Sequence, residues 1–269
     1  MVKIKSLSFI TFKGGIRDRT ILGIVLLAFL LLISTPLFSS FSMRQILAVA
    51  VDYNLSTISF IGIILSIFAG INLIARDIDR RSIYTVISLP ISRSQYLIAK
   101  FLGLVFIIIF SLLILTIFGS ISILLTSHLY PQDLNSDIHW YKFFLSIFYI
   151  ILKLIIITSA VFLFTSFTTS PFLPLILSFI FYFIGESTEE VKTFIEGIGR
   201  EKTSPIIKAV AQFAYYIFPN LSAFDLKPHA IYGLPLDYRA LFFVFLYGIF
   251  YTGVILTLSV IIFSRREFL

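Results

Sequence analysis

Few residues of this chain could carry chemistry, because 58% of its 269 residues are hydrophobic and only 13% are charged. The most distinctive is Lys153, an ionisable residue deep within a long apolar run. A charge inside a membrane-spanning segment is by default a candidate functional site. The structural alternative is that Lys153 snorkels to the interface or pairs with a neighbouring helix. The sequence leaves both interpretations open.

A cluster of charges of mixed sign is the second candidate. It consists of Arg76, Asp77, Asp79, Arg80 and Arg81. One interpretation is an anchor on anionic lipid at the membrane surface. The other is a docking site for a soluble cytoplasmic partner, which the mixed sign of the charges and the ordered pattern after them favour. Residue physics alone does not decide between the two.

The other polar residues form no recognisable catalytic or cofactor motif. His128, His139 and His229 lie outside the apolar runs and lack H-E-x-x-H spacing, so we interpret them as solvated loop residues. The pair Glu189-Glu190 lacks the histidine motifs of intramembrane glutamate proteases. The sequence contains no P-loop, no G-x-G-x-x-G pattern and no cysteine. We therefore expect the chain to bind no metal and no nucleotide of its own.

The elements that must position these residues are apolar runs. A helix needs about 20 apolar residues to cross a hydrocarbon core of about 30 Å. Six runs qualify, and all should be helices because helices satisfy their own backbone in lipid. The runs are 21–38, 57–75, 100–127, 140–163, 171–184 and 240–263. The sequence predicts an all-α polytopic membrane protein with a single membrane domain over residues 1–269.

The distribution of Lys and Arg predicts the orientation. With the N-terminus inside, the inner segments hold twelve basic residues against four acids. The outer segments hold eight basic residues against ten acids. Cytoplasmic loops collect Lys and Arg. We therefore expect both termini in the cytoplasm and a location in the plasma membrane.

Two segments outside the runs, both on the inner side, have recognisable patterns. Residues 1–19 mix basic and apolar side chains and predict a helix on the inner membrane surface. In 76–99, Tyr84 belongs to a short amphipathic helix that Pro90 ends. Ser92 and Gln95 then form a capping box that begins the next helix, with Arg93 inside it.

The longest segment between runs is 185–239, on the outer side. Its first part is charged and reads as solvated. Ile206, Val210, Phe213 and Ile217 then follow helical spacing over a stretch too short to span the membrane. We expect an amphipathic helix that lies in the outer interface or re-enters the membrane.

The stretch RRSIYTVISLPISRSQYLIAK, residues 80–100, resembles the loop between the second and third spans of ABC-2 class ABC transporter permeases. The C-terminal FSRREF, residues 263–268, is similar to that family's closing pattern. The segment FPNLSAFDL, residues 218–226, resembles the subgroup that includes the nitrous oxide reductase maturation permease. Ser82 and Arg81 depart from the Thr and Gly that are usual at their positions.

The resemblance implies a transmembrane subunit that pairs with a second permease subunit, identical or related, and with two ATP-hydrolysing chains. The loop 76–93 would couple ATP-driven closure to the spans, residues 1–19 would be the elbow helix, and the 206–218 helix would close an outer gate. ATP and Mg²⁺ would bind the partner ATPase, so the chain is not expected to be an enzyme. The alternative is a non-ABC membrane enzyme or assembly factor.

The apolar lining of the spans favours an amphipathic or lipid-like cargo, or mechanical work on an outer protein partner. Besides that partner we expect contacts with membrane lipid and none with nucleic acid. We expect the transporter to be an exporter.

Overall fold

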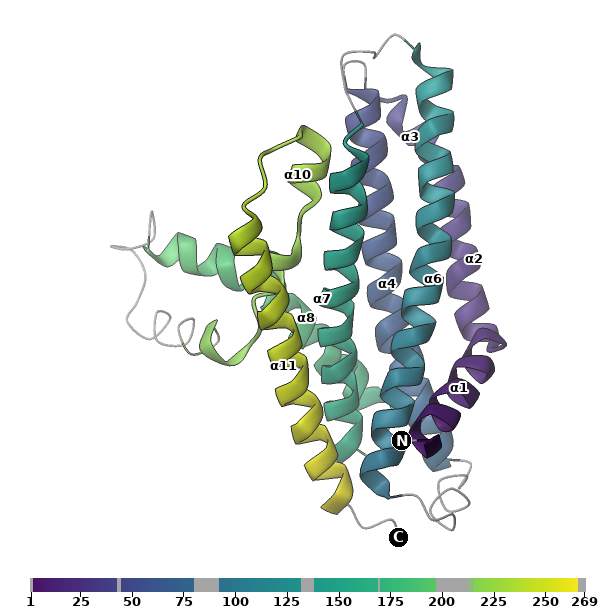
Figure 1. Ribbon diagram of the computed structural model, residues 1–269, viewed down its shortest axis with the longest axis vertical. Coiled ribbons are helices and arrows are strands. Elements are labelled where there is room, and N and C mark those ends of the chain that lie inside the picture. Colours follow the sequence, from purple (N-terminus) through teal and green to yellow (C-terminus); the bar gives the residue numbers. More distant parts are fainter. Residues whose placement is uncertain are drawn as a thin grey trace.

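The computed structural model describes residues 2–42, 45–79, 92–131, 138–168, 170–196, 213 and 215–265. These parts are helical apart from turns and short connections (Figure 1). The helices are α1 (Val2–Ile16), α2 (Arg19–Ile33), α3 (Thr35–Ser39), α4 (Ile46–Asp79), α6 (Arg93–Leu129), α7 (Trp140–Phe167), α8 (Phe172–Glu196), the 3-10 helix η2 (Ser222–Phe224), α10 (Lys227–Tyr232) and α11 (Tyr238–Arg265).

Within the described residues, five helices are long and apolar enough to cross a membrane: α4, α6, α7, α8 and α11. The longest, α6, has 37 residues. At 1.5 Å per residue it is about 55 Å long, well beyond the hydrocarbon thickness, so it must project from the membrane. The second, third, fourth and sixth predicted runs each fall within one of these helices, and the fifth, 171–184, begins one residue before α8. The helices themselves begin earlier or end later than the runs.

The first predicted run, 21–38, is not one helix. Its residues form α2, of 15 residues, and the short α3. Pro36 is the cause, because proline has no N–H to donate to the carbonyl four residues earlier, that of Leu32. The hydroxyls of Thr35 and Ser122 donate to that carbonyl instead, each at 2.7 Å. Asn54 Nδ2 in turn donates to the Thr35 hydroxyl at 3.2 Å.

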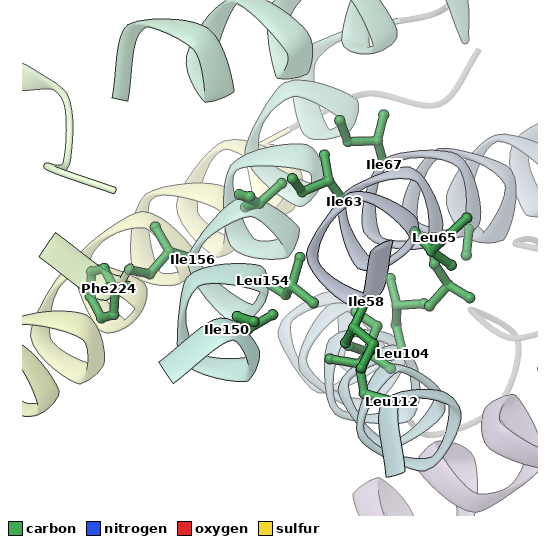
Figure 2. Close-up of a cluster of buried hydrophobic side chains, with 14 of the residues drawn as sticks. Ile58, Ile63, Leu65, Ile67, Leu104, Leu112, Ile150, Leu154, Ile156 and Phe224 are labelled. Atoms are coloured by element: carbon green, nitrogen blue, oxygen red, sulfur yellow. The ribbon is translucent and has the colours of Figure 1, made fainter. Parts of the chain in front are cut away.

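The core lies where α4, α6 and α7 pack together (Figure 2). Glycines on α4 allow α7 to approach closely, as small residues do between membrane helices. A Cβ at Gly62 would collide with the Leu154 side chain, and a Cβ at Gly70 would lie 2.8 Å from Val161. Ile58 and Leu154 are fully buried in this core. The remaining long helices, α8 and α11, lie against α7, and few of their side chains are fully buried.

Different elements lie at the two ends of the bundle. Figure 1 shows α1, the first turns of α6 and the end of α11 at one end of the bundle, here called the α1 end. The short helices α3 and α10 lie toward the opposite end, here called the α3 end. The helix α1 crosses α6 obliquely and packs on it. Both ends of the described chain therefore lie at the α1 end.

Candidate functional site

The first candidate, Lys153, lies on α7 with 5% of its side chain exposed. Its Nζ is 2.5 Å from Glu186 Oε2 on α8, and 5.6 Å from the centroid of the Tyr182 ring. A buried ammonium is costly unless an opposite charge lies next to it, and Glu186 supplies that charge. The structure therefore shows the helix pairing that the structural alternative named, and it does not test a functional role of Lys153.

The sequence does not predict Glu186 as the partner of Lys153, because Glu186 belongs to the charged outer stretch that is expected to be solvated. The helix α8 continues to Glu196 instead of ending near residue 184. Glu and Lys are good helix formers, and the described stretch after Gly185 holds no Pro or Gly that would stop the helix. The extension brings Glu186 to the same level as Lys153. The sequence held one signal for this pair, because Lys153 lies within one apolar run and the next run is followed by acids.

The segment after the predicted outer helix docks on α8 and α11. The Leu221 N–H donates to the Gly185 carbonyl at 2.9 Å. Asn220 Nδ2 donates to Glu189 Oε2 at 2.8 Å, and the Asn220 N–H donates to the Tyr247 hydroxyl of α11 at 3.0 Å. Glu189 is exposed, as the sequence suggested, and it also accepts a hydrogen bond from the outer segment of the same chain.

Of the predicted outer-gate residues, the structure describes two. Phe213 is 67% exposed and Ile217 is 49% exposed, at the last turn before Pro219. The Tyr251 hydroxyl donates to the Ile217 carbonyl, which joins this turn to α11. Ile206 and Val210 lie outside the described residues.

The sequence did not reveal the contacts that Phe224 makes. It lies in the turn-rich outer segment, yet it is fully buried. Figure 2 shows its ring beside Ile156 of α7. The ring also meets α11, where a Cβ at Gly248 would lie 3.0 Å from it. The Phe224 ring therefore adds an apolar contact to the hydrogen bonds that hold the outer segment against the bundle.

A cleft of about 430 Å³ lies between this outer segment and α11. Its lining is mostly aromatic and includes Tyr215, Tyr216, Phe243, Tyr247 and Tyr251. Rings with hydroxyl groups offer both an apolar face and a polar edge. The cleft suits a molecule that is itself amphipathic.

At the α1 end, the start of α6 and the end of α11 are joined. The predicted capping box is confirmed: the Ser92 hydroxyl accepts from the Gln95 N–H at 3.2 Å, and Gln95 Oε1 accepts from the Ser92 N–H at 3.3 Å. Arg93 Nη1 donates to the Ser264 carbonyl at 3.2 Å.

The structure describes part of the predicted docking cluster. Arg76, Asp77 and Asp79 fall in the last turns of α4, where the structure describes the backbone only. Arg80, Arg81, Tyr84 and Pro90 lie outside the described residues.

The described residues do not assemble a metal site. In those parts of the chain no three His, Asp or Glu side chains gather as metal ligands would. His128 lies in the last turn of α6, His139 at the start of α7 and His229 in α10. His139 lies next to Gly233. Gly233 has a φ of 66°, and its carbonyl accepts a hydrogen bond from Lys142 Nζ at 2.6 Å. Both features fix the turn after α10.

Within the described residues, five helices are long and apolar enough to cross a membrane, and an ion pair joins two of them. These features define a multi-pass α-helical membrane protein. The family model described as ABC-2 family transporter protein matches residues 9–268. The chain therefore belongs to the ABC-2 family and is a transmembrane subunit, or permease, of an ABC transporter. No curated protein matches the chain.

Proposed function

We propose that this permease works with a separate ATPase chain that docks at the α1 end of the bundle. The observation that carries this proposal is the arrangement of α4 and α6. The mixed-charge cluster begins in the last turns of α4, and the capped start of α6 lies at the same end of the bundle. Residues 76–93 would then transmit ATP-driven closure into the two helices that form the core.

Co-purification of the permease with a P-loop ATPase, either encoded by a neighbouring gene or co-expressed with it, tests the proposal. Arg80→Glu/Arg81→Glu should reduce ATPase recovery strongly, because it reverses two charges in the docking cluster. The matched control is Lys13→Glu/Arg17→Glu, which makes the same charge change on exposed side chains of the α1 end. Unchanged recovery with the first variant, or an equal loss with both, would rule out docking at this cluster.

We propose further that the chain crosses the plasma membrane six times with both termini in the cytoplasm. The sixth crossing would be α2 together with α3, which form one nearly continuous apolar segment. Both ends of the described chain lie at the α1 end, which agrees with an even number of crossings. The excess of basic residues on the segments at this end supports its placement inside.

The same proposal includes a dimer of permease subunits and export of an amphipathic cargo. The exposed apolar faces of α8 and α11 could meet a second subunit as well as lipid. The aromatic cleft beside the outer segment would receive the cargo's headgroup, and the helix containing Phe213 and Ile217 would open and close it. The Phe218–Leu226 segment supports a place in the subgroup of the nitrous oxide reductase maturation permease.

Cargo class is tested by stimulation of ATPase activity in the reconstituted complex. Amphiphiles with apolar tails should stimulate the wild-type complex, and hydrophilic solutes should not. Tyr216→Ala removes an 82% exposed ring from the cleft and should weaken stimulation without affecting basal hydrolysis. Equal stimulation by hydrophilic solutes would contradict the proposed cargo class.

A further inference from the structure

A groove of about 650 Å³ lies between α1 and α6, separate from the aromatic cleft. On the α6 side it follows one stripe, from Leu102 through Phe106 and Phe110 to Leu113. On the α1 side Phe9 forms part of the wall. These side chains are 37% to 65% exposed, so nothing within the described chain covers the groove.

The groove exists because the two helices cross at a glycine. A Cβ at Gly103 would lie 2.6 Å from the Thr11 side chain and 3.0 Å from the Ser8 carbonyl. The close crossing leaves the large aromatic side chains to stand beside it as walls. Phe12 and Phe110 meet edge to face, with ring centroids 5.8 Å apart, and join the two walls.

The length of the groove matches one leaflet. The α6 stripe from Leu102 to Leu113 covers eleven residue steps, or about 16 Å along the helix. Half of a hydrocarbon core of about 30 Å is about 15 Å. A single acyl chain that starts at the membrane surface would therefore fill the groove along its length.

The polar groups of the groove select the headgroup. Ser8 lines it, but its hydroxyl donates to the Ile4 carbonyl at 2.9 Å, so that group is satisfied within α1. Lys5 is the one charged residue in the lining, and it is exposed. Lys5 lies on the turn of α1 before Ser8 and so toward the start of α6, at the membrane-surface end of the stripe. An apolar channel with a cation at its surface end is complementary to an anionic amphiphile.

We propose that this groove is a binding site for an anionic phospholipid of the leaflet at the α1 end. One acyl chain lies along α6 between the aromatic walls, and the phosphate lies beside Lys5. The basic side chains of Lys13 and Arg17 add a general attraction for the same leaflet, but they do not line the groove. The site does not depend on docking of an ATPase or on the identity of a cargo.

The site is tested by native mass spectrometry of the full-length protein exchanged from vesicles of equal phosphatidylglycerol and phosphatidylcholine content. The wild type should retain phosphatidylglycerol preferentially. Lys5→Gln should lower that retention about fivefold, because a basic residue at the membrane surface contributes about that factor toward an anionic lipid. Lys13→Gln, the matched control on the same helix, should change it much less.

Ile109→Trp tests the apolar part of the site, because the larger side chain would occupy the groove that Ile109 lines. This variant should retain less of both lipids while its thermal unfolding in detergent stays close to wild type. Equal losses with Lys5→Gln and Lys13→Gln would reduce the effect to general surface charge and overturn the site. Unchanged retention with Ile109→Trp, or a second copy of the chain cross-linked through the groove, would overturn it as well.

Discussion

The ion pair between Lys153 and Glu186 gives the sharpest prediction, because the two partners differ in exposure. Their side chains are 5% and 31% exposed, respectively. Removing one partner of a buried pair costs about 3–5 kcal/mol, since the other charge is left uncompensated. Glu186→Gln leaves the more buried charge and should cost about 4 kcal/mol. Lys153→Met leaves a carboxylate that water partly screens, and should cost about 2 kcal/mol.

These values convert into measurable shifts of the melting temperature. One kcal/mol corresponds to about 2–4 °C for chains of this size. Thermal unfolding in detergent should therefore fall by about 8–16 °C for Glu186→Gln and by about 4–8 °C for Lys153→Met. Glu190→Gln is the matched control, because it neutralises an exposed carboxylate on the same helix. It should stay within about 0.5 kcal/mol of wild type.

The double variant Lys153→Met/Glu186→Gln decides whether the cost comes from a stranded charge. With both charges absent nothing is stranded, so its melting temperature should lie above that of Glu186→Gln alone. A double variant that loses the sum of the two single losses would refute the reasoning. Single variants that both melt like the Glu190→Gln control would refute it too, because the pair would then contribute nothing.

Three further predictions concern other contacts. Phe224→Ala should cost about 3 kcal/mol in thermal unfolding because it empties a fully buried site between α7 and α11, whereas Phe213→Ala, at an exposed ring, should be nearly neutral. Gly233→Ala should lower the free energy of unfolding by at least about 1 kcal/mol, because its φ of 66° is left-handed and the new Cβ would collide with His139. The control Gly14→Ala, whose Cβ would meet open space, should match wild type or gain stability. A reporter fused after Leu269 should read as cytoplasmic, with one inserted near residue 204 reading as external; an external signal after Leu269 would mean an odd number of crossings.

Local signals in the sequence were sufficient for several elements. The capping box at Ser92 predicted the start of α6 correctly, because its two hydrogen bonds involve residues only three positions apart. The proline at position 36 was visible, but its effect was not. Whether a proline in a membrane helix ends it depends on donors from other helices, and the donor from α6 is Ser122.

Hydrophobicity alone misplaced several helix boundaries. The helix α4 begins at Ile46 although Asp52 and Asn54 lower the apolar character of its first turns. Asn54 is fully buried there and donates to the Ala50 carbonyl at 2.8 Å. Membrane insertion was predicted from apolar content, whereas the extent of a helix depends on its backbone hydrogen bonds. The same distinction explains the charged extension of α8.

The contacts that join the outer segment to the bundle could not be read from the sequence. Phe224 looks like any exposed aromatic residue in a turn-rich stretch until Gly248 is known to face it. Glu186 and Lys153 sit on different helices, and only the packing of α7 on α8 sets them at one level. Contacts of this kind depend on the relative placement of elements, which a single sequence does not specify.

The break between α2 and α3 constrains the order in which this sequence could change. The Ser122 hydroxyl donates to the Leu32 carbonyl, which lacks the backbone donor that Pro36 cannot supply. If Pro36 were first replaced by Ala, the new N–H could reach that carbonyl, and position 122 would then accept an apolar residue. If Ser122 were lost first, the carbonyl would keep Thr35 alone as a side-chain donor, at a cost in stability. Among related permeases, proline at position 36 should therefore occur together with a hydroxyl at position 122, although the two residues lie on different helices.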